Sequence, residues 1–280
     1  MGRADQLYER LPIPGQHAAV TAYGAYWAWA RFGRGYRAHL SAVLARDRWT
    51  HDEWEQWQHR ALVGVLRDAV DRVPYYRATF SAAQRQAASA GRLEELPLLD
   101  KEPLRADPER FVDPARRPRR PRVFHTSGSS GTPFATIWSL DELRLSMALR
   151  EARSARWAGV SFRLPRATFS GRMVEPRADS LGPYHRFNAV ERQIYLSPFH
   201  LGPDTAPAYA EAFRRHGIQW GTGYAVSFSL LAGYLLDADG PRPSLRAVIT
   251  TSEELTDPMR ERIGAAFGCT VREEYSSVEN

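Results

Sequence analysis

The sequence predicts an α/β protein, in which a mixed and largely parallel sheet is flanked by helices and preceded by a helical N-terminal segment. From Thr205 onward, short runs rich in β-branched residues alternate with helical patterns, which is typical of βαβ units. The first hundred residues instead carry apolar residues at helical spacing. We therefore predict a helical part at residues 1–113 and an α/β part at residues 114–280.

The N-terminal part is predicted to contain at least two packed helices. The stretch 17–30 is rich in alanine and aromatic residues but too short and too polar to span a bilayer, so we expect it to pack on a core. Contact with a membrane surface is the alternative for this stretch. A second helix ends at Pro74, and Tyr75 and Tyr76 are expected to pack beside that proline. Its predicted buried face consists of Trp54, Trp57, Ala61, Leu62, Val65, Ala69 and Val73.

Residues 114–122 form the most basic run of the chain. Such a run could bind phosphate or nucleic acid. However, it lacks the aromatic residues on which single strands stack, and its prolines prevent a regular recognition helix. We interpret it as a solvated connection and expect no nucleic-acid partner.

The α/β part begins with two short strands, Arg122–His125 and 134–138, which are rich in β-branched and aromatic residues. Later elements alternate in type. They are a helix at 141–157, strands at 167–170 and 192–196, a helix at 207–216, a strand at 218–222, a helix at 225–236, a strand at 246–251, a helix at 258–267 and a strand at 270–275. Ligands of parallel sheets usually bind beyond the carboxyl ends of the strands. Polar segments follow three of these strands, at 221–224, 250–253 and 275–279.

The first two strands enclose the segment Thr126-Ser-Gly-Ser-Ser-Gly-Thr-Pro133. Gly128 and Gly131 leave backbone N–H groups open to a ligand, and successive N–H groups in such a turn can form an anion-binding nest. A surface turn is the alternative for this segment taken alone. The lysine of a P-loop is missing, and a strand rather than a helix follows, so a Walker site is excluded.

The composition is that of a soluble globular protein, with 43% hydrophobic and 25% charged residues. The net charge of +6 comes from arginine, since Lys101 is the only lysine, and it would suit nucleotides or nucleic acid alike. Cys269 is the only cysteine, so a disulfide framework and a cysteine-based zinc cluster are both excluded. The N-terminus lacks the apolar core of a signal peptide, and we expect a cytoplasmic protein.

Four segments together resemble the adenylate-forming ligases, in particular the branch similar to phenylacetate–CoA ligases and capsule-biosynthesis adenylate-forming proteins. Residues 126–133 resemble the family's phosphate loop, and Gly221-Thr-Gly-Tyr-Ala-Val-Ser227 resembles its G-Y-P-S segment. Residues 250–256 resemble the segment beside the adenine, and 274–279 resemble the Y-G-x-[ST]-E motif. Stretches at 66–80 and 96–101 are also similar to the family, so the resemblance covers most of the chain.

The resemblance implies an acid–thiol ligase of the AMP-forming, acyl-CoA synthetase type. Such an enzyme uses ATP and Mg²⁺ to convert a small carboxylic acid to an acyl-adenylate, which then reacts with coenzyme A or another thiol. Ser127, Gly128, Ser129, Ser130, Gly131 and Thr132 would hold the phosphates, and Ser252, Glu253 and Tyr275 would surround the adenine. Tyr224 and Ala225, with part of the 167–200 region, would bind the acid. Thr126 and Glu279 would be catalytic, and Glu279 would bind the metal.

The sequence departs from the family pattern at two places. Ser276 stands where the family motif has glycine, and the sequence ends at Asn280, before the ribose-binding aspartate and the small C-terminal domain of the family. We therefore expect an incomplete large lobe without that domain. The alternative is a non-catalytic binding or scaffold protein that keeps the fold and offers its basic surface to a partner. His125 is interpreted as a hydrogen-bonded strand residue, and His185 and His200 receive no role.

Overall fold

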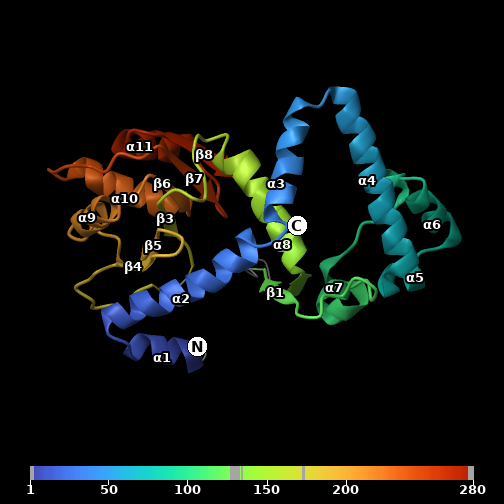
Figure 1. Ribbon diagram of the computed structural model, residues 1–280, viewed down its shortest axis with the longest axis horizontal. Helices are drawn as coiled ribbons and strands as arrows, with labels where there is room; N and C mark the ends of the chain where they lie inside the picture. Colours follow the sequence, from blue (N-terminus) through green and yellow to red (C-terminus); the bar gives the residue numbers. More distant parts are fainter. Residues whose placement is uncertain (1–2, 127–132, 134, 172–173, 277–280) are drawn as a thin grey trace. The chain divides into compact units, whose positions relative to one another are not determined.

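A six-stranded sheet is the centre of one of two compact units in the computed structural model of the chain (Figure 1). The structure describes residues 3–126, 133, 135–171 and 174–276. One unit contains Met1–Tyr36 and Met147–Ser276, and the other contains Arg37–Ser146. This division differs from the predicted boundary at residue 113, which concerned parts of one ligase lobe and stays a prediction.

The sheet of the first unit has the order β4-β5-β3-β6-β7-β8. Its strands are β3 (Arg166–Phe169), β4 (His185–Asn188), β5 (Gln193–Leu196), β6 (Trp220–Gly223), β7 (Ala247–Thr251) and β8 (Thr270–Glu274). All neighbouring pairs are parallel except β4 and β5, which are antiparallel at one edge. The predicted mixed and largely parallel sheet is therefore confirmed.

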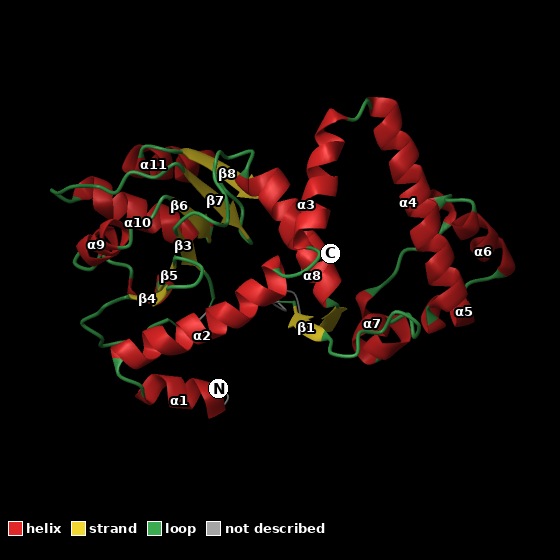
Figure 2. Cartoon of the chain, viewed as in Figure 1, coloured by secondary structure: helices red, strands yellow, loops and turns green. Residues whose placement is uncertain are grey.

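Three helices cover one face of this sheet, as the α/β pattern predicts (Figure 2). They are α9 (Ala206–Arg215), α10 (Ala225–Asp237) and α11 (Asp257–Phe267). Phe213 and Phe228 from these helices join Phe169 of β3 and Phe267 in one buried cluster. Burial of such aromatic side chains is the main stabilising contribution of the layer.

The opposite face is approached by the end of α8 (Leu140–Leu149) and by the turn that continues it. The sequence pattern predicts one helix over 141–157, but the helix widens into a π-helical turn at Arg150–Ala155. Beyond this turn, the ring of Phe162 packs edge-on against Trp220 of β6, with 5.2 Å between ring centroids. A wide turn of this kind leaves no periodicity signal in the sequence, because it adds only one residue to a helical turn.

Helix α2 (Ile13–Phe32), which follows α1 (Arg3–Arg10), packs against the edge strand β4 (Figure 1). Its His17 Nδ1 accepts a hydrogen bond from the Phe187 N–H at 2.9 Å. One turn later, the Thr21 hydroxyl donates to the Phe187 carbonyl at 3.3 Å and accepts from the Ala189 N–H at 3.2 Å. Side chains of α2 therefore satisfy backbone groups on the outer side of the sheet.

The second unit is mainly helical. Its elements are α3 (Tyr36–Ala45), α4 (His51–Arg72), α5 (Pro74–Thr79), α6 (Ala82–Ser89), α7 (Lys101–Ala106), the strands β1 (Arg122–His125) and β2 (Ala135–Trp138), and the first part of α8. Helix α4 begins with a capping box, in which Thr50 and Glu53 each satisfy a backbone N–H of the other. The strands β1 and β2 pair antiparallel, with His125 opposite Ala135.

The predicted helix that ends at Pro74 is confirmed, but part of its predicted buried face is wrong. Val65 is 66% exposed and Ala61 is exposed as well, while Val70, which was not predicted, is buried; Val73 is buried as predicted. Several spacings of apolar residues fit this helix. The face that packs against helix α6 is shifted by about one residue from the predicted face. The ring of Tyr75 is packed, as expected, but its partner is Phe111, on which it stacks at 4.3 Å between ring centroids.

Candidate functional site

Three of the predicted ligand segments follow adjacent parallel strands. Gly223 of β6 lies opposite Thr250 of β7, and Thr251 lies opposite Glu274 of β8. The next residues are Tyr224, Ser252 and Tyr275. They therefore follow strands whose carboxyl ends lie at the same end of the sheet, which is the edge meant below. This arrangement is the one in which α/β proteins bind their ligands.

The end of β3 also reaches this edge, because β3 and β6 approach closely there. Gly223 has a φ of 131° and pairs with Phe169 of β3, and a Cβ at Gly223 would overlap the Phe169 carbonyl oxygen. A Cβ on Gly171 would lie 2.8 Å from the Tyr224 hydroxyl, so that hydroxyl lies over the segment after β3. Only glycine fits at Gly223, and the close approach it allows brings Tyr224 next to β3.

The segment after β7 is strained and is tied to helix α10. Ser252 has a φ of 72°, in the left-handed region that non-glycine residues seldom adopt and that often marks functional sites. The Glu253 carboxylate accepts a hydrogen bond from the Val226 N–H, at 3.1 Å, in the first turn of α10. A carboxylate is favoured at that end of a helix. Ala225 of the same turn is fully buried, whereas Ser252 and Glu253 are exposed.

The segment after β8 combines an exposed ring with anchored neighbours. Tyr275 is 95% exposed, whereas the side chain of Glu274 is only 6% exposed. The Nε of Arg150 donates to Glu274 Oε1 at 2.7 Å. The hydroxyls of Ser276 and Thr251 are 3.1 Å apart, which ties the ends of β7 and β8 together.

The predicted phosphate loop lies largely outside the described residues. Ser127, Gly128, Ser129, Ser130, Gly131 and Thr132 lie outside them, as does the predicted metal ligand Glu279. The flanking strands β1 and β2 confirm that the loop joins two strands, with Thr126 directly after β1. His125 is an exposed residue of β1. Within the described residues, no group of three or more His, Cys, Asp or Glu side chains could hold a metal ion.

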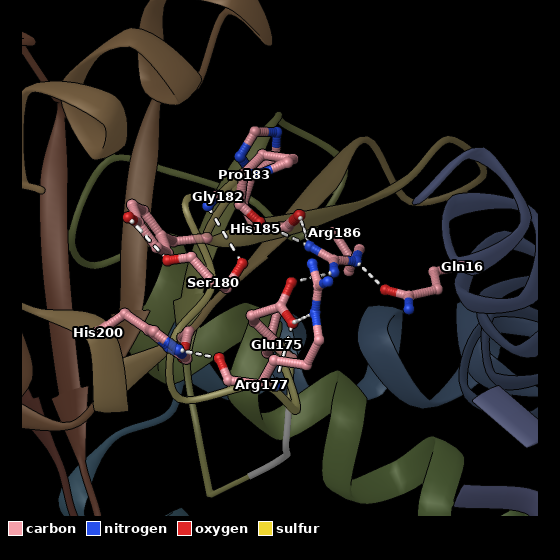
Figure 3. Close-up of polar contacts among 12 residues, drawn as sticks. Gln16, Glu175, Arg177, Ser180, Gly182, Pro183, His185, Arg186 and His200 are labelled. Carbon is pink, nitrogen blue, oxygen red and sulfur yellow. Dashed lines mark hydrogen bonds and ion pairs between the residues drawn. The ribbon is translucent and has the colours of Figure 1, made fainter. Parts of the chain in front are cut away.

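A buried ion pair, which no local sequence pattern indicates, holds the region between β3 and β4 (Figure 3). The Arg186 guanidinium donates to Glu175 Oε2 at 2.7 Å and to Gln16 Oε1 of α2 at 2.6 Å. It also donates to the carbonyls of Pro183 and His185 at 2.7 and 2.8 Å. Burial opposes ionisation of Glu175, but hydrogen bonds from Arg186 and Arg177 outweigh it and lower its pKa.

Three histidines lie beside this ion pair. The Nε2 atoms of His185 and His216 are 3.1 Å apart, so at least one of the two rings must be neutral to accept the hydrogen bond. Burial, together with the charges of His216, His17, Arg186 and Arg215, lowers the pKa of His185 to about 3. Burial likewise lowers the pKa of His17 and His216. The cluster is therefore neutral at pH 7.

His200 binds elsewhere in the same region. Its Nδ1 lies 2.7 Å from the Ser197 hydroxyl and its Nε2 lies 2.8 Å from the Arg177 carbonyl, so both ring nitrogens have structural partners. Along the described part of the chain, no helix combines the length and apolar character needed to cross a bilayer.

The chain is similar to known proteins in sequence and in fold. No family model matches the chain. Protein CapK of Staphylococcus aureus is 23% identical over 188 residues, which are 67% of this chain and 41% of CapK. The chain thus spans about two fifths of the curated relative that it matches.

Among solved structures, the chain resembles a 2-hydroxyisobutyryl-CoA ligase in its open conformation with 2-HIB-AMP and CoA. That match has a TM-score of 0.51 and 18% identity, and covers 78% of this chain and 50% of the ligase. The same ligase in its postadenylation state with R3-HIB-AMP gives a TM-score of 0.50 at 18% identity, over 80% of this chain and 49% of the ligase. The chain therefore shares the fold of the adenylate-forming ligases, which confirms at the level of the fold the resemblance that its sequence motifs predict.

Proposed function

We propose that this chain is the nucleotide-binding part of an AMP-forming ligase that activates a carboxylic acid. In the first step a carboxylate oxygen attacks the α-phosphorus of ATP, a new O–P bond forms, and pyrophosphate leaves. In the second step the thiol of coenzyme A displaces AMP. The observation that carries the proposal is the single sheet edge to which β6, β7 and β8 bring Tyr224, Ser252 and Tyr275, in a fold shared with an acyl-CoA ligase.

Five of the predicted residues receive a role at this end of the sheet. Tyr275 would stack on the adenine, which its 95% exposure allows. Ser252 and Glu253 would line the adenine on the side of β7, and Tyr224 with Ala225 would lie on the side of the acid. The buried Ala225 would act through its backbone, because its side chain is closed off.

The chemistry of the first step suits hydroxyls, N–H groups and carboxylates. The nucleophile is already ionised, so the protein needs to align it and to stabilise the charge on the phosphates. The N–H groups and hydroxyls of Thr126–Thr132 would supply donors for the phosphates. Glu279 would supply an oxygen ligand of the kind that Mg²⁺ prefers, and a bound Mg²⁺ would neutralise phosphate charge.

The acceptor and the acid are finer parts of the proposal. The similar ligase was solved with CoA, and we propose coenzyme A as the thiol for this protein as well. The acid would be a small aryl acetate, a benzoate or another acyl substrate. We further propose that the enzyme is located in the cytoplasm, where ATP and coenzyme A are both present.

The proposal is tested by nucleotide binding and by ATP–pyrophosphate exchange. Calorimetry should detect ATP and AMP binding to the folded chain, and exchange should be measured with a panel of aryl, hydroxy and fatty acids. A folded protein that binds neither nucleotide would contradict the proposal. Salt-sensitive binding of DNA or RNA without nucleotide binding would instead favour a non-catalytic binding protein.

The basic run gives the nucleic-acid outcome little support. Arg116 lies 2.7 Å from Asp68, and Arg117 forms an ion pair with Glu109. Both arginines already have carboxylate partners within the second unit. A nucleic acid would have to displace these carboxylates, which reduces the free energy gained from each phosphate contact.

A further inference from the structure

Tyr275 presents a large ring that packing does not hold. The ring is 95% exposed, so almost none of the usual gain from burying an aromatic side chain fixes its position. The residues on both sides are held by side chains from other elements: Glu274 by Arg150, and Ser276 by Thr251. The backbone that carries the ring is therefore fixed even though the ring is not.

Arg150 forms the first of these two anchors. It begins the π-helical turn, its Nε lies 2.7 Å from Glu274 Oε1, and its guanidinium lies 5.1 Å from the centre of the Phe162 ring. Glu151, the next residue of the turn, accepts a hydrogen bond from the Phe162 N–H at 2.9 Å. The backbone of Phe162 is thus held by Glu151 and its ring packs on Trp220, and π-helical turns occur frequently at functional sites.

Glu274 depends on this anchor. Its side chain is 6% exposed, and its second oxygen, Oε2, is buried without a hydrogen-bond partner among the described residues. A buried carboxylate is costly unless a cation faces it. Removing the Arg150 guanidinium would leave the last residue of β8 unstable in its present position, directly before Tyr275.

Ser276 forms the second anchor, at the position where the related motif has glycine. Its hydroxyl is 3.1 Å from the hydroxyl of Thr251, at the end of β7. A glycine could not make this bond and would leave more backbone freedom after Tyr275. This hydrogen bond gives a structural reason for serine in place of the glycine of the motif.

We propose that Arg150 and Ser276 are positioning residues, which hold Tyr275 in place to stack on the adenine of a bound nucleotide. This inference rests on the proposed function, since it assigns Tyr275 to the base. It predicts that replacing either residue weakens the binding of the adenine base but does not change the binding of phosphate groups.

The test compares two probes by calorimetry: AMP, which carries the base, and tripolyphosphate, which does not. Tyr275→Ala should weaken AMP binding about tenfold or more, as expected for the loss of one stacked base. Arg150→Met and Ser276→Gly should weaken AMP binding about three- to tenfold and should change tripolyphosphate binding less than about twofold. Arg150→Lys, which keeps the cation, should recover most of the loss. Adding Arg150→Met to Tyr275→Ala should cause no further loss, because both changes act through the same ring.

Arg214→Met is the matched control, because Arg214 also pairs with a glutamate, Glu211, but lies on α9. It should bind both probes like the unaltered protein. If Tyr275→Ala weakens AMP binding while Arg150→Met and Ser276→Gly do not, the positioning role is wrong and the proposed function stands. An equal loss of affinity for AMP and for tripolyphosphate would also contradict the positioning role, because general unfolding gives that result.

A second measurement does not require a nucleotide. 3-Fluorotyrosine labelling gives a ¹⁹F resonance for Tyr275, which is assigned by its loss in Tyr275→Phe. A narrower line in Arg150→Met than in the unaltered chain would support the anchor, and identical lines would contradict it. If the unaltered chain bound neither ATP nor AMP, the proposed function would fail, and this line width would still decide whether Arg150 fixes the backbone that carries the Tyr275 ring.

Discussion

Breaking the buried Arg186–Glu175 pair should strongly destabilise the first unit, because one buried charge would be left without its partner. Both side chains are 1% exposed, and Arg186 makes four hydrogen bonds of 2.6–2.8 Å that join α2, the segment before β4 and β4 itself. Arg186→Met leaves the Glu175 carboxylate buried, with the Arg177 N–H at 3.1 Å as a remaining donor. We expect this change to lower the free energy of unfolding by about 3–5 kcal/mol.

The assay is a double-mutant cycle in urea, followed by tryptophan fluorescence and circular dichroism. Glu175→Gln alone should also be strongly destabilising, but the double variant should lose much less than the sum of the two losses, because neither charge is then left alone. Arg177→Met is the matched control: Arg177 reaches the same carboxylate at 3.5 Å, but its side chain is 65% exposed. It should cost less than about 1 kcal/mol. A loss below about 1 kcal/mol for Arg186→Met, or strict additivity in the cycle, would refute the reasoning.

Three further changes have clear expected outcomes. Gly223→Ala should destabilise by about 3 kcal/mol or more in urea unfolding, because the new methyl would overlap the Phe169 carbonyl and the φ is unfavourable; near-normal stability would contradict this. The ordinary pKa of histidine is 6.5, and that of His185 in the folded protein is about 3, so between these pH values His185 takes up a proton only when the protein unfolds. The melting temperature should therefore fall as the pH drops from about 6.5 towards 3. His185→Gln should make this fall smaller, and an equal fall in the variant would contradict the reasoning. Burial raises the pKa of the Cys269 thiol to about 11, so Ellman's reagent should react slowly at pH 8 with the folded protein and fast in denaturant; equal rates would show an open thiol.

The sheet and its covering helices could be predicted because each has a local pattern. Residues 205–275 alternate strand and helix patterns, and the structure keeps that order with shifts of one or two residues. β4 gave no such signal, because its sequence His-Arg-Phe-Asn is mostly polar. Its polar side chains are satisfied by partners far away in the chain, such as Gln16, and these pairings cannot be inferred from local spacing.

The candidate site was predictable to a different extent. Motif order placed Tyr224, Ser252 and Tyr275 after three strands, and the parallel register brings the ends of those strands to one edge. What the sequence could not indicate is how these segments are held. The Arg150–Glu274 pair joins residues 124 positions apart, and the hydrogen bond of Ser276 to Thr251 cannot be inferred from its departure from the motif.

The contact between α2 and β4 has a practical consequence for shortened versions of this protein. An edge strand with free N–H and C=O groups is a template on which another chain can add a strand, and such additions lead to aggregation. His17 and Thr21 occupy those groups on Phe187 and Ala189. A variant that begins after Phe32 would lose this cover, and we expect it to form insoluble assemblies even if its remaining core could still fold.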